Sequence, residues 1–112
     1  MGDGYMVAFK SAAGALRCAI AMQQGFASNT EVRVRIGLHT GPVVREHDDF
    51  YGRTVNYAAR VASSALGGEI AVSADLRRML DGQFAFDEGR AVELKGFGGE
   101  HRVFLVAGQQ PG

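Results

Sequence analysis

The sequence has no excess of charge of either sign, because its 112 residues carry twelve basic and twelve acidic side chains. It therefore has no overall field that would attract nucleic acid or an anionic membrane. Cysteine is almost absent. The lone Cys18 excludes an internal disulfide and fits a reducing compartment. Its neighbours follow a helical pattern, which favours a small buried thiol over a reactive one.

Long apolar runs are also missing, since no stretch approaches the ~20 residues that a membrane span needs. The first five residues have neither the basic start nor the apolar stretch of a signal peptide. The length allows one domain at most, and the composition is that of an ordinary globular protein. We therefore expect a single domain over residues 1–112, located in the cytoplasm, without a membrane segment or a nucleic-acid partner.

Apolar periodicity and turn residues predict nine elements in the order β-α-β-β-α-β-α-β-β. The predicted strands cover residues 4–9, 32–36, 43–45, 69–73, 91–94 and 102–106. The predicted helices run from a cap at Ser11 to about Gln24, from Gly52 to near Gly67, and over residues 74–80. This order favours an α+β sandwich of the ferredoxin-like βαββαβ type, with helices on one face of a largely antiparallel sheet. Such a domain would have one more strand and helix before Gly2, so we expect the first strand and helix to be missing and the domain to be partial.

The most informative segment is DFYGRTVNYAAR, residues 49–60. Its apolar positions continue to residue 62 and cover one face of a helix; they are Val55, Ala58, Ala59, Val61 and Ala62. Asn56 and Arg60 are four residues apart, so both side chains leave the same side of that helix, one turn above the other. An amide beside a guanidinium suits a sugar oxygen next to a phosphate, although such a pair on a surface helix is often only solvated.

Three further residues are candidates for chemistry. Asp3 lies between two glycines at the head of a strand, where a metal could approach its carboxylate, but a turn aspartate looks the same. Lys95 lies at the mouth of a glycine-rich hairpin and could reach a phosphate. Asp49 could accept a hydrogen bond from a nucleobase amine, or it could simply belong to an acidic loop.

Other chemical schemes fit less well. The three histidines, His39, His47 and His101, lack metal-ligand spacing, and no serine has the context of a hydrolase nucleophile. The glycines after Lys95 are not a dinucleotide fingerprint, because no helix follows them. Arg33 and Arg35 alternate on one strand without the aromatic residues that a nucleic-acid platform needs. A nucleic-acid-binding α+β domain is therefore disfavoured.

Four segments in order resemble the catalytic domain of the class III nucleotidyl cyclases, the adenylate and guanylate cyclases. They are GDGYMVAF (2–9), RIGLHTGPV (35–43), DFYGRTVNYAAR (49–60) and ELKGFG (93–98). The resemblance covers almost the whole chain, and the third segment is its most specific part. It implies a lyase of cyclic-nucleotide biosynthesis and intracellular signalling that forms a 3′,5′-cyclic nucleotide and pyrophosphate with Mg²⁺ or Mn²⁺.

The resemblance also implies roles for the candidate residues. Asp3 matches a metal-binding aspartate and Asp49 the residue that reads the base, where an acidic side chain suits the adenine amino group of ATP. Asn56 matches the residue that orients the ribose, Arg60 the one that stabilises charge on the transferring phosphate, and Lys95 the lysine that holds the terminal phosphates. GTP is left open, because the family's base-reading lysine falls before Gly2.

Family members act as head-to-tail dimers, so the resemblance implies a homodimer or a pair with another cyclase domain, in which each partner contributes part of the site. The family's first metal aspartate also falls before Gly2. We therefore expect little turnover from this chain alone. The alternative is a non-catalytic, cyclase-like module that binds nucleotide or regulates a complete cyclase.

Overall fold

The computed structural model describes residues 11–27, 33–40 and 52–109, and these form three helices and five strands. In chain order the elements are α1 (Ala12–Phe26), β1 (Ile36–Leu38), α2 (Gly52–Ser63), β2 (Ile70–Ser73), α3 (Ala74–Met79), β3 (Phe84–Phe86), β4 (Arg90–Leu94) and β5 (Phe97–Gln109). The predicted strands at 4–9 and 43–45 lie outside the described residues. No described helix is long and apolar enough to cross a membrane.

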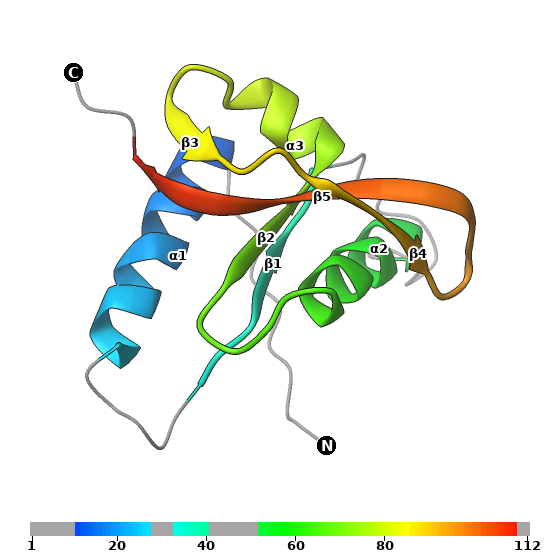
Figure 1. Cartoon of the computed structure of the whole chain (residues 1–112), viewed down its shortest axis with the longest axis horizontal. Coiled ribbons are helices and arrows are strands. Elements are labelled where there is room, and N and C mark those ends of the chain that lie inside the picture. Colours follow the sequence, from blue (N-terminus) through cyan, green and yellow to red (C-terminus); the bar gives the residue numbers. More distant parts are fainter. Residues whose placement is uncertain (1–10, 28–32, 41–51, 110–112) are drawn as a thin grey trace.

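The described strands form one sheet in which β5 pairs with three other strands (Figure 1). Its central part pairs with β2, its C-terminal part with β3 and its N-terminal part with β4, each time antiparallel. Only β1 and β2 pair in parallel among these strands. The predicted α+β class with a largely antiparallel sheet is thus confirmed.

The two faces of the sheet carry separate cores, because neighbouring strand residues point in opposite directions. On one face Ile70 and Val72 of β2 pack with α1 and α3, whose buried residues include Leu16 and Leu76. On the other face Ala71 packs with α2. Figure 1 accordingly shows α1 and α2 on opposite sides of β1 and β2. The expectation that all helices lie on one face is therefore wrong: α1 and α3 cover one face, and α2 covers the other.

Helix boundaries largely follow the capping residues. The Ser11 side chain accepts a hydrogen bond from the Gly14 backbone N–H at 3.1 Å, which confirms the predicted cap of α1. That helix continues through Gly25 and ends at Phe26, whereas the predicted helix ended at about Gln24. Cys18 is exposed on α1, so the predicted buried thiol is wrong.

Two strand predictions also need correction, and one strand was not predicted. The strand expected at 32–36 appears as β1 at 36–38, and residues 33–35 are not in a strand. β3 was not predicted, because its three residues are too few for a recognisable alternation. β5 begins at Phe97 instead of Arg102, because the glycine-rich stretch continues the ladder with β4 through a register shift.

Candidate functional site

Helix α2 carries two of the predicted site residues and lies directly on the sheet. Its buried Val61 fills the core beside β2 and β5. Asn56 is exposed and Arg60 is half-buried, one turn apart on the same helix, as the spacing predicted. Ala59 is exposed, which contradicts its expected place on the buried face. Asn56 and Arg60 therefore lie on the solvent-accessible side of a helix whose opposite side is packed in the core.

Lys95 lies in the turn between β4 and β5, where Gly96 adopts a φ of 87°. The residue before it, Leu94, is buried in the same core as Val61, the neighbour of Arg60. This shared core holds the Lys95 hairpin against α2, and Figure 1 shows the two elements side by side. The structure therefore brings the elements of three predicted residues together. Asp3 and Asp49 lie outside the described residues.

An aromatic cluster joins α2, the end of β1 and the β4–β5 hairpin. Tyr57 is at its centre, with ring centroids 4.4 Å from His39, 5.0 Å from Phe97 and 5.3 Å from His101. The Phe97 and His101 contacts are edge-on, a favourable arrangement for aromatic pairs. The spacing of these histidines was considered only for metal binding, and the cluster was not predicted. The residue that could have indicated the cluster is Tyr57, an aromatic side chain directly after Asn56.

Hydrogen bonds fix the polar edges of this cluster. The Tyr57 hydroxyl lies 3.0 Å from Nδ1 of His101, and Nε2 of His101 lies 3.0 Å from the Gly98 carbonyl oxygen. Because a carbonyl only accepts, Nε2 of His101 carries a hydrogen, and in the neutral imidazole Nδ1 then accepts a hydrogen bond from the Tyr57 hydroxyl. On the other side, Nδ1 of His39 lies 2.8 Å from the hydroxyl of Ser73, which also accepts from the Leu76 N–H.

Burial affects the titration of two members of the cluster. Burial lowers the pKa of His39 below its ordinary value of 6.5, and the Asp75 carboxylate opposes this shift more weakly. Burial, and secondarily the charge of Asp75, raises the pKa of Tyr57. Around neutral pH the cluster therefore contains a neutral imidazole at His39 and a phenol at Tyr57 that keeps its proton.

The cationic groups beside the cluster are available to a ligand. Within residues 11–27, 33–40 and 52–109, the ion pairs join Arg77 to Asp81 and Arg78 to Asp75, and neither involves Arg60 or Lys95. The same residues contain no group of three histidine, cysteine or carboxylate side chains that could hold a metal ion. The described part of the site thus offers donors to anionic and hydroxyl oxygens.

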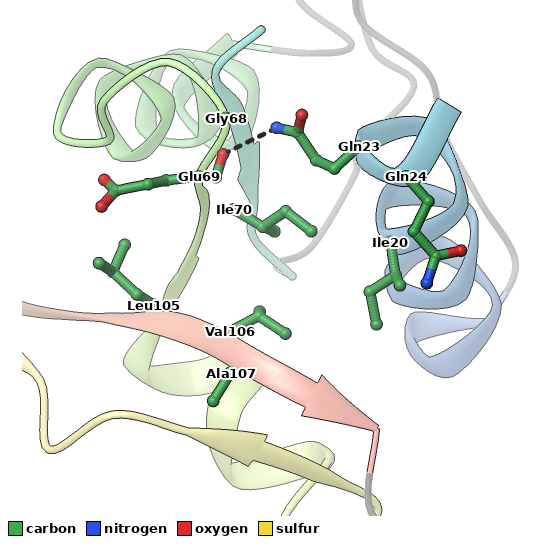
Figure 2. A pocket seen from close by; sticks show the side chains of 9 residues that line it. All are labelled: Ile20, Gln23, Gln24, Gly68, Glu69, Ile70, Leu105, Val106 and Ala107. Atoms are coloured by element: carbon green, nitrogen blue, oxygen red, sulfur yellow. Dashed lines mark hydrogen bonds between the residues drawn. The ribbon is translucent and has the colours of Figure 1, made fainter. Parts of the chain in front are cut away.

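An open cavity of about 400 Å³ lies elsewhere, between the C-terminal half of α1 and strands β2 and β5 (Figure 2). Apolar side chains such as Ile20 and Val106 form much of its wall. Gln23 crosses one end, where its side-chain amide donates to the carbonyl oxygens of Val34 at 2.8 Å and Glu69 at 3.1 Å. These bonds tie α1 to the sheet, and none of the predicted site residues lines the cavity.

The fold agrees with comparisons with known proteins. Residues 1–108 match the model of the adenylate and guanylate cyclase catalytic domain family, so the chain belongs to this family. A putative adenylate cyclase of Rhizobium meliloti is 33% identical over 93 residues, which cover 77% of this chain and 16% of that protein. An uncharacterized protein of Mycobacterium tuberculosis is 36% identical over 86 residues, covering 77% of this chain and 30% of that protein.

Among solved structures, the chain is similar to the catalytic core of a rhodopsin-guanylyl cyclase with converted specificity in complex with ATPalphaS. The TM-score is 0.76 and the identity 28%, and the match covers 93% of this chain and 62% of the other. The chain therefore spans less than a third of these two curated relatives and under two thirds of this catalytic core.

Proposed function

We propose that this chain supplies the Asn, Arg and Lys half of an adenylate cyclase active site, which converts ATP to 3′,5′-cyclic AMP and pyrophosphate. The observation that carries the proposal is that Asn56, Arg60 and Lys95 lie on elements that pack into the same core. The first two lie on α2, and the third lies on a hairpin whose Leu94 is buried in the same core as Val61 of that helix. Donors carried on elements that share one core suit a charged substrate, because held donors need little reorganisation when charge develops.

In the proposed reaction the ribose 3′-hydroxyl loses its proton to solvent water, and its oxygen attacks the α-phosphorus in line. The new phosphorus–oxygen bond closes the ring, the bond to the bridging oxygen of the β-phosphate breaks, and pyrophosphate leaves. Asn56 holds the ribose, Arg60 stabilises the negative charge of the transition state, and Lys95 binds the terminal phosphates. Asp49 accepts from the adenine amino group, which favours ATP over GTP. Similar structures hold ATPalphaS, in a guanylyl cyclase core with converted specificity, and GTP, which supports a nucleoside triphosphate as the substrate class.

The metal belongs to the part of the site that the described residues do not provide. Mg²⁺ or Mn²⁺ prefers carboxylate and phosphate oxygens, whereas α2 and the hairpin offer an amide and two cations. We therefore assign metal binding to Asp3 and to a second carboxylate, as the family resemblance implies. When bound, the ion neutralises phosphate charge and polarises the reacting oxygens. In the proposed head-to-tail pair, a second cyclase domain brings its metal carboxylates to the Asn56, Arg60 and Lys95 side chains of this chain.

A complementation assay tests the proposal. Cyclic AMP formation from Mg²⁺-ATP or Mn²⁺-ATP is measured for this chain alone and for its mixture with a complete cyclase domain whose own Asn/Arg helix has been inactivated. The proposal expects product in the mixture and little from either component alone. The same mixture with GTP measures base preference. No product from a folded, associated mixture would overturn the catalytic proposal and leave a non-catalytic cyclase-like module.

A further inference from the structure

The proposed site requires that two separate elements, α2 and the β4–β5 hairpin, keep a fixed position relative to each other. Asn56 and Arg60 are carried by α2, whereas Lys95 is at the tip of the β4–β5 hairpin. Residues 95–100 of this hairpin are exposed, except for Phe97, and a Cβ added at Gly96, Gly98 or Gly99 would meet no atom within 4 Å. The packing around the tip is thus sparse, and specific side-chain contacts must fix its position.

We propose that Tyr57 is a positioning residue that sets the β4–β5 hairpin, and with it Lys95, relative to the Asn56/Arg60 face of α2. This inference rests on the function proposed above. Tyr57 precedes Arg60 by three residues, so these two side chains leave neighbouring positions on the helix surface, and Tyr57 directly follows Asn56 in the sequence. Its ring and hydroxyl reach the hairpin, where they contact Phe97 and His101.

The hydrogen bonds form a continuous link from the helix to the hairpin tip. The Tyr57 hydroxyl donates to Nδ1 of His101 at 3.0 Å, and Nε2–H of His101 donates to the Gly98 carbonyl at 3.0 Å. Gly98 is three residues after Lys95. Since the pKa of Tyr57 is raised, the hydroxyl keeps the proton that this link uses. The link therefore ends on β5 within three residues of Lys95, at the sparsely packed end of the hairpin.

Packing and positioning are separable at this residue. Tyr57→Phe keeps the ring that contacts His39, Phe97 and His101, and it removes only the hydroxyl. If Tyr57 merely fills the core, this substitution changes little beyond stability. If the hydroxyl positions the hairpin, the substitution displaces Lys95 and weakens binding of the terminal phosphates, while Arg60 continues to act on the transition state. The expected signature is a higher KM for ATP at nearly unchanged kcat.

The kinetic test uses the mixture with the complementing cyclase domain described above. Loss of one hydrogen bond between neutral groups predicts a rise in KM of about two- to tenfold for Tyr57→Phe. Lys95→Ala raises KM on its own, and in that background Tyr57→Phe should add less than about a further twofold change, because residues acting through one contact are not additive. Ser63→Ala is the matched control. It removes a side-chain hydrogen bond of α2, to the Ala59 carbonyl, that does not involve the hairpin.

Backbone hydrogen exchange of the chain tests the link independently of turnover. Exchange in the segment 94–101 should be faster in Tyr57→Phe and in His101→Leu than in the wild type, and unchanged in Ser63→Ala. The inference would be overturned by unchanged exchange in both Tyr57→Phe and His101→Leu, or by additive effects of Tyr57→Phe and Lys95→Ala on KM. A fall in kcat for Tyr57→Phe as large as the rise in KM would overturn it as well. An inactive wild-type mixture combined with faster exchange in Tyr57→Phe would overturn the proposed function and support the link.

Discussion

Gly37 of β1 lies directly against Ala62 of α2, so closely that a Cβ on Gly37 would be 2.3 Å from the Ala62 backbone nitrogen and 2.5 Å from its Cα. Real Cβ atoms do not approach backbone this closely, so any larger residue must push the helix away from the sheet. Glycine at this position therefore sets the depth at which α2 packs, and with it the positions of Asn56 and Arg60.

The first prediction concerns this contact. Gly37→Ala should lower the free energy of unfolding by about 1–3 kcal/mol, because overpacking against backbone atoms cannot be relieved by a side-chain rotation. Urea denaturation measures the change. Gly25→Ala in α1 is the control, since its added Cβ meets no atom within 4 Å and alanine favours a helix, so stability should be unchanged or slightly higher. Equal stability of Gly37→Ala and the wild type would show that α2 does not pack as described.

The second prediction concerns Arg60. Arg60→Ala should lower the turnover of the complemented mixture by about 10²–10³-fold with a smaller effect on KM, because a donor aimed at developing charge stabilises the transition state more than the substrate. Arg60→Lys should restore only part of this loss, since an ammonium lacks the planar fork of the guanidinium. Cyclic AMP formation at several ATP concentrations separates the two constants.

A charge-matched control is available for Arg60. Arg17 is exposed on α1, which packs on the opposite face of the sheet from α2, so Arg17→Ala should leave both constants unchanged. A rise in KM without loss of kcat in Arg60→Ala would assign Arg60 to substrate binding and contradict its proposed role.

Local sequence signals predicted much of the helical structure. The serine cap of α1 and the four-residue spacing of Asn56 and Arg60 depend on residues close in the chain, and both appear in the structure. The roles of Asn56, Arg60 and Lys95 stay predictions, as do the positions of Asp3 and Asp49.

Contacts between distant residues could not be predicted in this way. Tyr57 and His101 are 44 residues apart, and no local periodicity links them. The glycines after Lys95 favour a turn by themselves, yet pairing with β4 extends the strand through them. The placement of α2 on the face opposite α1 likewise depends on the alternation of β2, where Ile70 and Ala71 contact different helices.

The third prediction compares two helix caps. Ser11 and Ser73 each accept a hydrogen bond from a backbone N–H three residues later, at 3.1 and 3.3 Å. Ser11 is exposed, whereas Ser73 is buried and also bonds His39. Ser11→Ala should cost about 0.5–2 kcal/mol of unfolding free energy, as caps usually do. Ser73→Ala should cost about 1–3 kcal/mol more, because it also leaves the half-buried imidazole without a partner. Equal costs in urea denaturation would show that the His39 contact adds no stability.

The last prediction is a pH dependence that originates at His39. Burial holds the folded-state pKa of His39 below its ordinary value of 6.5, so between these two values the unfolded chain binds more protons than the folded one. The contribution of neutral His39 to stability is therefore complete above about pH 6.5, falls as the pH decreases below that value, and is lost once the pH passes the folded-state pKa. Among the described residues, the groups that face His39 are the Ser73 hydroxyl, the Tyr57 ring and, at longer range, the Asp75 carboxylate, which opposes the shift.

His39→Asn tests this dependence, because it removes the titrating imidazole and keeps a polar side chain near Ser73. Other groups also titrate in this range, so the quantity to measure is the difference in unfolding free energy between wild type and variant at each pH from 8 to 5. The stability of the wild type relative to the variant should decrease steadily below about pH 6.5. Parallel curves would show that His39 has the same pKa in both states, and a relative gain at low pH would show that the charge of Asp75 outweighs burial.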